Sequence, residues 1–516
     1  MSAAAASPHA AATRVGADVL AAGGSAMDAA IVVNAMLTVV YPHMCGLAGD
    51  LFLLYRDATS GRVWALNGSG PAPLRATRRA FRERGLAQVP ARGPLPATVP
   101  GAVASWAAGL ERFGRRPLAE LLAPAAQAAM DGVEVTARLA GWIEHNAADL
   151  AADPVLRERW LDGDGRAIAA GTTVRQPDVA RTLHRLMDGG ADEMYRGALA
   201  AEIDEAFRAA DGLLRREDLA AFAPEWGQPV RLRHRGLDVL TTPPNSQGVT
   251  ALMMLNALTV LDPGPPGTAD HVEALIAAKR FAFAERDRHV ADPRFEPVAV
   301  DELLSLDRAR EALGGGSKPA PARSSAGDTV YLCTVDHDGN ACSLIQSVYY
   351  GFGSCFVAGE TGLLFQNRGH YFSLDAEHAN RLEPGKRPLH TLMASMAFEG
   401  DDLRLLFGCM GADGQAQTTV QMLERRLAGG SVADVVSLPR ILHGRFVPED
   451  DPDALTIEAP FGDRVIAALR ERGHDPDVVG EHDERLGHAQ AIELRPDGTL
   501  DAASDPRSDG AAIVVD

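Results

Sequence analysis

The chain has 516 residues, which is longer than one ordinary domain and ample to bury a large core. Its 50 Lys and Arg side chains stand against 69 Asp and Glu side chains, giving a formal net charge of −19 at pH 7. An acidic chain without a basic run is a poor partner for nucleic acid or an anionic membrane surface, so we exclude both.

The cysteines and the N-terminal residues predict the compartment. Five cysteines, an odd number without a Cys-x-x-Cys pair, lie mostly in apolar surroundings and predict buried thiols rather than a disulfide framework. Residues 1–12 are small and Ala-rich, with neither a basic start nor a long apolar stretch, and no apolar run of about 18 residues follows. We therefore expect a soluble, cytoplasmic protein.

Helical patterns dominate the prediction for the first 300 or so residues, with a few strands among them. Residues 9–20 favour a helix that ends at Gly23 and Gly24, and Ser25 can cap a more apolar helix over residues 26–40. Periodicity and turn signals predict further strands over 51–55 and 62–67, and helices over 103–112, 199–209, 249–258 and 271–288.

A β-hairpin follows a segment that has no apolar periodicity. Residues 314–328 are filled with Gly, Pro, Ala and Ser and predict an exposed, mobile linker. Residues 329–335 and 341–348 are strand-like, and the intervening Asp, Gly and Asn residues supply turn chemistry. The remaining chain predicts strands over 363–367, 393–398 and 403–407, a glycine turn over 408–415 and a helix over 418–428.

Thr329 stands at the border between the linker and the hairpin. If the bond before it is cut, its α-amino group and its hydroxyl lie on one residue, and the pair can serve as base and nucleophile. Such a nucleophile needs no separate histidine. A linker followed by a strand that merely begins with threonine is the plainer interpretation, and Gly-Asp-Thr alone does not decide between the two.

The residues after Thr329 form a specific pattern. A threonine opens a strand, a Val-Asp-x-x-Gly-Asn turn follows, and a second hydroxyl residue, a Phe-Gly pair and a Gly-Glu-x-Gly segment come next. The residues concerned are Thr329, Val335, Asp336, Gly339, Asn340, Ser347, Phe352, Gly353, Gly359, Glu360 and Gly362. In order and spacing they resemble the γ-glutamyltransferase (γ-glutamyltranspeptidase) family, and the likeness extends over nearly the whole chain.

The resemblance implies an α+β fold, the four-layer αββα sandwich of the N-terminal nucleophile (Ntn) hydrolases. The family is made as a precursor, so we expect autocatalytic cleavage between Asp328 and Thr329. The resulting segments, 1–328 and 329–516, would be intertwined in one fold. Thr329 would be the nucleophile, and Ser347 would hydrogen-bond to it.

The glycine turn would supply an oxyanion hole. A glycine turn between a strand and a helix presents N–H groups that can stabilise an oxyanion, although a plain connection is the commoner role of such a turn. The family has two consecutive glycines there, and Gly411 and Ala412 occupy those positions. Alanine keeps the N–H donor but carries a strain penalty if its φ is positive.

The positions that would contact the substrate depart from the family. Its arginine for the α-carboxylate of a γ-glutamyl group corresponds to Asn67, and its Asn and Asp for the α-amino group correspond to Tyr349 and Tyr371. Without the arginine and the aspartate, the charge-assisted bonds to that group are lost. A family glutamine and a serine pair become Arg368, His390 and Thr391. Arg368 and His390 would meet a different anionic or aromatic acyl group, and Tyr349 and Tyr371 would form a wall for it. Alternatively, each of these residues serves only at the surface or in packing.

We therefore expect an autoprocessing hydrolase or acyltransferase that cleaves a small-molecule amide through an acyl-threonine and passes the acyl group to water or an amine. The resemblance links it to glutathione metabolism. Two alternatives stay open: a pathway-specific amidase or acylase with a substrate other than γ-glutamyl, and an uncleaved homologue that only binds. No metal or organic cofactor is expected. The partners would be its own two fragments, and a homodimer of the cleaved pair is a further alternative.

Overall fold

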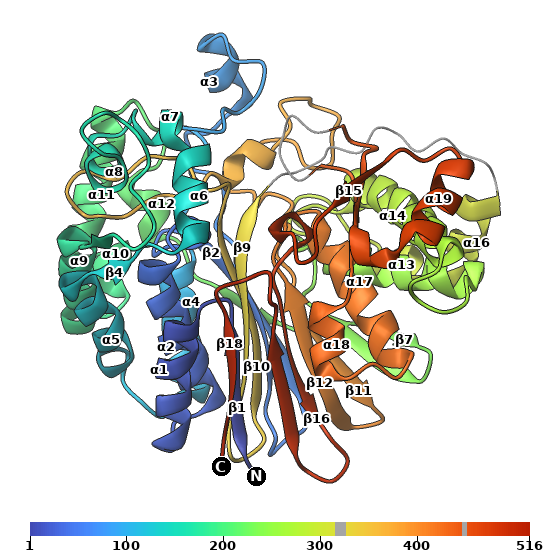
Figure 1. Cartoon of the computed structure of the whole chain (residues 1–516). Helices are drawn as coiled ribbons and strands as arrows, with labels where there is room; N and C mark the ends of the chain where they lie inside the picture. The colour runs from blue at the N-terminus through green and yellow to red at the C-terminus, as the bar shows by residue number, and fades with distance from the viewer. Residues whose placement is uncertain (315–326, 446–450) are drawn as a thin grey trace.

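Two antiparallel β-sheets lie face to face at the centre of the molecule (Figure 1). The computed structural model describes residues 1–314, 327–445 and 451–516. The first sheet contains, in spatial order, β18 (Ala511–Val515), β1 (Ala3–Ser7), β9 (Asp328–Val335), β10 (Ala341–Tyr349), β2 (Asp50–Arg56), β3 (Val63–Gly68) and β6 (Glu225–Gly227). The second contains β17 (Leu500–Ser504), β16 (Ala489–Leu494), β12 (Asp402–Cys409), β11 (Ser395–Glu399), β8 (Leu237–Thr241) and β7 (Val230–His234).

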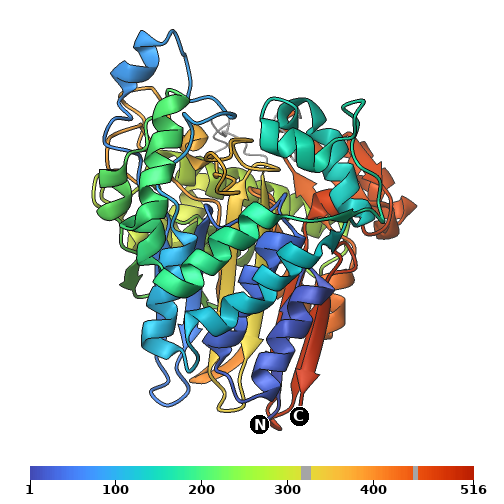
Figure 2. The same ribbon diagram turned by 90° about the vertical axis from the view of Figure 1, so that its left-hand side faces the viewer.

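Helices cover the outer face of each sheet, as Figure 1 and the rotated view in Figure 2 show. On the first sheet's side lie α1 (Ala10–Ala21), α2 (Ala26–Val40), α4 (Ala102–Phe113), α5 (Leu118–Asp131), α6 (Ala137–His145), α7 (Ala147–Leu150), α8 (Pro154–Trp160), α9 (Pro177–Gly189), α10 (Asp192–Tyr195), α11 (Ala198–Ala209) and α12 (Arg216–Ala220). On the other side lie α13 (Gly248–Leu261), α14 (Ala269–His289), α15 (Val300–Leu303), α16 (Leu306–Gly314), α17 (Gly414–Leu427), α18 (Val432–Ser437) and α19 (Asp463–Glu471).

Smaller elements complete the chain. They are α3 (Arg78–Glu83), the 3-10 helices η1 (Arg368–Tyr371), η2 (Ala459–Phe461) and η3 (Glu484–Leu486), the pair β4 (Val133–Glu134) and β5 (Thr173–Val174), and the sheet of β13 (Ile441–His443), β14 (Leu455–Glu458) and β15 (Pro476–Val479).

Three buried apolar clusters fill the spaces between the layers. Alternate residues of a strand face opposite sides of its sheet. In β9, Val330 and Leu332 therefore pack toward α2, whereas Tyr331 and Cys333 face the second sheet, where they meet residues such as Leu406. The third cluster joins the second sheet to α13, α14 and α17. These layers confirm the αββα sandwich that the resemblance implied.

Both sheets combine strands from either side of the bond between Asp328 and Thr329. In the first sheet, β9 and β10 lie between β1 and β2. In the second, β7 and β8 continue the sheet formed by β11, β12, β16 and β17. Each part of the chain therefore completes the sheets of the other.

Several local predictions are confirmed. The hairpin is β9 and β10, which pair antiparallel. Helix α2 spans the predicted residues, and Ser25 forms a capping box with Asp28. All five cysteines are buried and free. In the described part of the chain, no helix is long and apolar enough to cross a membrane.

Other predictions are wrong or lie outside the described residues. Residues 363–367 are not a strand, because Leu364 and Phe365 make only isolated bridges. Helix α17 begins at Gly414 rather than at 418, because its first N–H groups already bond to the glycine turn. Gly314 ends α16 instead of opening the linker. Residues 315–326, the main part of that linker, lie outside the described residues.

Candidate active site

Two hydroxyl groups converge on the peptide bond at the start of β9. The Thr329 hydroxyl donates a 2.7 Å hydrogen bond to the carbonyl oxygen of Asp328, and the Ser347 hydroxyl donates a 2.6 Å bond to the same oxygen. Asp328 and Thr329 are each 2% exposed, so the junction is shielded from bulk water. Thr329 thus lies near the start of a core strand, as predicted, with Asp328 as the first residue of that strand.

The periodicity of β9 directs Thr329 into the space between the sheets. Thr329 lies on the same face of the strand as Tyr331, which belongs to the core between the two sheets. The Tyr331 ring lies against Gly408 near the end of β12, where a Cβ atom would stand 2.5 Å from it. The turn that follows β12 therefore lies on the side of the sheet that Thr329 faces.

Ser347 reaches the junction at a shift in the pairing of β9 with β10. The shift falls between Gln346 and Tyr349. The Ser347 oxygen accepts a 2.7 Å hydrogen bond from the Tyr349 N–H, which leaves its own hydrogen for the Asp328 carbonyl. The resemblance implied a bond from Ser347 to the nucleophile, but in the intact chain the bond goes to the carbonyl that this nucleophile faces. A donor there stabilises negative charge on the oxygen.

The glycine turn presents two neighbouring backbone donors. Among the described residues, the N–H groups of Gly411 and Ala412 have no hydrogen-bond acceptor. Their φ angles are 122° and 46°. Ala412 is therefore left-handed, the strained case that the sequence left open, at a cost of about 1 to 2 kcal/mol. Unsatisfied neighbouring N–H groups are the donors that an oxyanion hole needs.

Two glutamines, to which sequence reasoning gave no role, hold the turn and the nucleophile. The Gln415 amide donates a 3.3 Å hydrogen bond to the Thr329 hydroxyl oxygen. The Gln247 amide donates to the carbonyl oxygens of Ala412 (2.9 Å) and Thr391 (2.7 Å). The available signal for Gln415 was its place in the first turn of α17, directly after the glycine turn.

Arg368 and two tyrosines form a second group beside the junction. The Arg368 guanidinium carbon lies 3.9 Å from the centroid of the Tyr349 ring, and its Nη1 donates a 3.0 Å bond to the Thr391 hydroxyl. The Tyr371 ring meets Tyr349 edge-on at 5.9 Å. Tyr349 itself pairs with Asp328 across the strands. Both tyrosines line a cavity of ≈ 620 Å³.

A comparison with protein families identifies the family of the chain. The family model for gamma-glutamyltranspeptidase matches residues 12–515. The chain belongs to the γ-glutamyltranspeptidase family. It is 38% identical over 516 residues to the glutathione hydrolase-like YwrD proenzyme of Bacillus subtilis (strain 168), with 99% of this chain and 98% of that protein covered.

Two other members of the γ-glutamyltranspeptidase fold are similar over nearly their whole length. The oxamate amidohydrolase proenzyme of Klebsiella pneumoniae is 38% identical over 522 residues, with 98% of this chain and 97% of that protein covered. The crystal structure of a cephalosporin acylase from Bacillus halodurans superposes with a TM-score of 0.89 at 34% identity, covering 99% of this chain and 95% of that one. The protein is thus an Ntn hydrolase, an enzyme of the γ-glutamyltranspeptidase family that acts on amides.

Asn67 and His390, two residues predicted to contact the substrate of this member of the γ-glutamyltranspeptidase family, form no hydrogen bond with Arg368 in the described structure. The Asn67 amide donates to the Asn245 side chain at 2.8 Å, and its oxygen accepts from the N–H and the hydroxyl of Ser69. The His390 ring lies 3.0 Å from the Asp50 carboxyl and is fully buried. Among the described contacts, both side chains bond within the scaffold, so a direct role at the substrate finds no support here.

Burial controls the protonation of the acids nearest the site. It raises the pKa of Asp328 well above its usual range; the charge of Glu484 adds to this effect and that of Arg92 opposes it. Burial likewise raises the pKa of Asp50 to about 7, although Arg368 and hydrogen bonding from Gly70 act in the other direction. Burial therefore favours the neutral form of the Asp328 side chain beside its own peptide bond.

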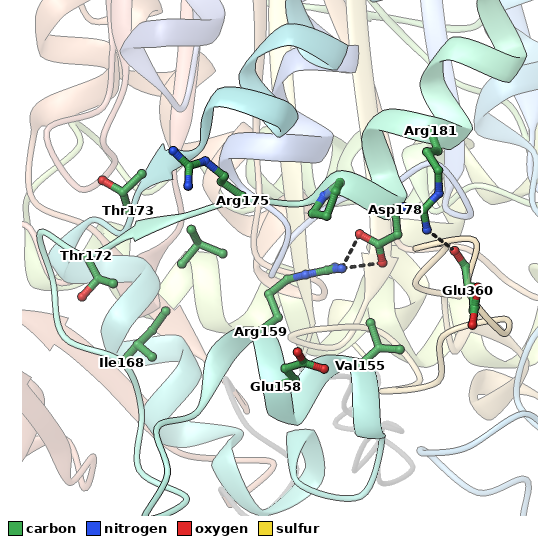
Figure 3. A pocket seen from close by; sticks show the side chains of 12 residues that line it. Val155, Glu158, Arg159, Ile168, Thr172, Thr173, Arg175, Asp178, Arg181 and Glu360 are labelled. Atoms are coloured by element: carbon green, nitrogen blue, oxygen red, sulfur yellow. Dashed lines mark hydrogen bonds and ion pairs between the residues drawn. The ribbon is translucent and has the colours of Figure 1, made fainter.

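The Gly-Glu-x-Gly segment of the family pattern serves packing. A cavity of ≈ 580 Å³ lies in the helical layer outside the first sheet (Figure 3). In it, Arg159 pairs with Asp178, and Arg181 donates to the Glu360 carbonyl oxygen at 3.3 Å. A Cβ atom at Gly362 would stand 2.7 Å from the backbone of α9. The described residues that line this cavity include none predicted for the site.

No group of three or more His, Cys, Asp or Glu residues in the described part of the chain is arranged to hold a metal ion.

Proposed function

We propose that Thr329 is the nucleophile of a small-molecule amidase and that the chain creates it by cutting its own bond between Asp328 and Thr329. The observation that carries this proposal is the convergence of the Thr329 and Ser347 hydroxyls on the Asp328 carbonyl oxygen. A carbonyl that faces a nucleophile and a hydrogen-bond donor is arranged for attack.

In the precursor, the Thr329 oxygen attacks the carbonyl carbon of Asp328. Negative charge then grows on the carbonyl oxygen, which the Ser347 hydroxyl stabilises. Collapse of this intermediate transfers the acyl group from nitrogen to oxygen and gives an ester. Water hydrolyses the ester and leaves the Asp328 α-carboxylate and the free α-amino group of Thr329.

In the cleaved enzyme, the α-amino group of Thr329 takes the proton from the Thr329 hydroxyl as the oxygen attacks a substrate amide. The Gln415 amide orients the hydroxyl, and the N–H groups of Gly411 and Ala412 bind the oxyanion. The α-amino group then gives the proton to the departing amine. Water attacks the acyl-threonine and releases the acid, and an amine acceptor in place of water would give transfer.

Relatives are named for glutathione and for oxamate, two amide substrates of different size. We favour an amidase reaction on an acyl group other than γ-glutamyl. The reason is that Asn67 bonds to Asn245 and Ser69, while Tyr349 and Tyr371 replace the polar partners of the γ-glutamyl amine. The five buried free thiols suit a reducing compartment, so we place the enzyme in the cytoplasm.

Denaturing gel electrophoresis of the purified protein tests the proposal. We expect two bands with the masses of residues 1–328 and 329–516, and Edman sequencing of the smaller should begin at Thr329. The Thr329→Ala variant should run as one chain of 54.6 kDa. A Thr329→Ala chain that is still cut, or a wild-type chain that stays intact, contradicts the proposal.

A further inference from the structure

Arg368 is a buried cation with unused hydrogen-bonding capacity. The residue is 1% exposed, and its one side-chain hydrogen bond in the described part of the chain goes to the neutral Thr391 hydroxyl. Its Nε and Nη2 atoms are buried there without a hydrogen-bond partner. An arginine fork can serve a carboxylate with two parallel bonds, and the two idle nitrogens are those of one side of this fork.

The protein provides little compensating charge for Arg368. Asp50 is a carboxyl group whose charge acts on it, but the Asp50 oxygens meet the Gly70 N–H and the His390 ring rather than the guanidinium. Burial also favours the neutral form of Asp50. The face of Tyr349 offers a partial negative charge, which is weaker than that of an anion. Burying a charge without a partner is costly, and a bound anion removes that cost.

A second unpartnered group lies beside the cation. The Tyr371 hydroxyl is buried without a hydrogen-bond partner among the described residues, and the Tyr371 ring packs edge-on against Tyr349. Tyr349 and Tyr371 both line the ≈ 620 Å³ cavity. An anion that meets Arg368 could therefore accept a further bond from the Tyr371 hydroxyl while its carbon chain packs against tyrosine rings.

The cation is tied to the oxyanion turn by a short chain of contacts. Thr391 accepts from Arg368 through its hydroxyl and from Gln247 through its carbonyl oxygen, and Gln247 also donates to the Ala412 carbonyl oxygen. One residue, Thr391, thus sets the positions of both the guanidinium and the turn.

Tyr349 covers Arg368 in the intact chain. Its φ is +83°, a left-handed conformation that is unfavourable for a tyrosine. The conformation is held by pairing with Asp328, by the bond from the Tyr349 N–H to Ser347, and by Gly327, where a Cβ atom would stand 2.8 Å from the Tyr349 oxygen. Two of these contacts come from residues upstream of the bond before Thr329. Cutting this bond separates Gly327 and Asp328 from the fragment that carries Tyr349.

From these contacts we propose that Arg368 binds a carboxylate on the acyl part of the substrate, so that the enzyme is specific for amides whose acyl group carries an acid. Cleavage before Thr329 releases Tyr349 and opens the cation to this group. The inference rests on the proposed acyl-threonine chemistry and adds the substrate class. Arg368 would thus bind the carboxylate from a different position than the family's arginine, whose place Asn67 occupies.

Two p-nitroanilide donors of equal chain length test the substrate class: glutaryl-p-nitroanilide, which carries a carboxylate, and pentanoyl-p-nitroanilide, which does not. Wild type should prefer the glutaryl donor in kcat/KM. Arg368→Gln should lose about 100-fold on the glutaryl donor, a loss typical of a charge-assisted contact, and change less than about 3-fold on the pentanoyl donor. Arg368→Lys should fall between. Arg84→Gln is the matched control, because Arg84 does not line this cavity and pairs with Asp211, so the preference for the glutaryl donor should stay unchanged.

A second experiment uses only the wild-type enzyme, so its outcome does not depend on the folding of a variant. Free glutarate should inhibit wild-type hydrolysis of the pentanoyl donor competitively, and pentanamide at the same concentration should not. Equal loss on both donors in Arg368→Gln, or equal inhibition by glutarate and pentanamide, overturns the carboxylate role of Arg368. The mass of the small fragment separates the causes: acyl adducts from both donors without a preference refute this inference alone, and no adduct from either refutes the Thr329 chemistry as well.

Discussion

The Ser347 hydroxyl donates a 2.6 Å hydrogen bond to the Asp328 carbonyl oxygen, the oxygen that gains negative charge when the bond after Asp328 is attacked. Ser347→Ala should therefore slow self-cleavage by about 100-fold, the loss typical of one oxyanion donor. The time course of fragment appearance on a denaturing gel measures the rate. Ser343→Ala is the control. Ser343 lies on the same strand as Ser347, but its hydroxyl bonds to the Tyr331 hydroxyl and to the Ser395 carbonyl oxygen. Wild-type cleavage in Ser347→Ala would refute this role.

Gln415 contacts the nucleophile oxygen at 3.3 Å. Gln415→Ala should lower kcat of the cleaved enzyme by about 10-fold with little change in KM, because the lost bond of about 1.4 kcal/mol orients the hydroxyl for reaction. Steady-state kinetics measure the split. Gln421→Ala removes a glutamine of the same helix that bonds instead to the Ile441 carbonyl oxygen, so kcat should stay unchanged. A change in KM alone would assign Gln415 to substrate binding instead.

Ala412 has a φ of 46°, which favours glycine. Ala412→Gly should leave the N–H donor and self-cleavage intact and raise the free energy of unfolding by up to about 1 kcal/mol, since relief of left-handed strain outweighs the added backbone entropy. Denaturant unfolding of chains that also carry Thr329→Ala, and so stay in one piece, gives the comparison. Ala416→Gly, in the first turn of α17 where the side chain is buried, should lower stability by about 1 kcal/mol. A loss of stability in Ala412→Gly would show that its φ carries no strain.

Lys279 is buried. The charged groups that act on it are Asp413, Arg286, Asp453 and Arg280, and it acts in turn on His443. Burial lowers its pKa from 10.5 to about 8. The unfolded chain therefore binds more protons between about pH 8 and pH 10.5, and the free energy of unfolding should rise across this window. Below about pH 8 the full penalty is present.

Lys279→Met should remove this rise and stabilise the protein at pH 7 by up to about 3 kcal/mol, the equivalent of the pKa shift. Urea unfolding at several pH values, again in the Thr329→Ala chain, measures both effects. The same pH slope in Lys279→Met and its parent would assign the rise to another group.

Local patterns were enough to predict much of the fold. Ser25 and the apolar run after it specify α2, and the turn at residues 336–340 specifies the hairpin. The strand predicted over 363–367 was wrong because strand propensity does not supply a partner: Phe365 instead packs its ring against Phe207.

The site was predictable only where its residues belong to a recognisable sequence motif. Thr329, Ser347 and the turn at Gly411 could be inferred from a linear pattern. The partners of the turn could not, because Gln247 lies 165 residues from Ala412 in the sequence and meets it only through the tertiary fold. The positive φ of Ala412 is likewise a property of the folded turn.

The most direct test of the central claim is the mass of the small fragment after wild-type protein reacts with glutaryl-p-nitroanilide and is quenched in acid. The account predicts a fragment of residues 329–516 that carries one glutaryl group on Thr329, lost again as hydrolysis proceeds. Full activity in a chain that remains uncut, or an acyl group found on any other residue, would contradict it.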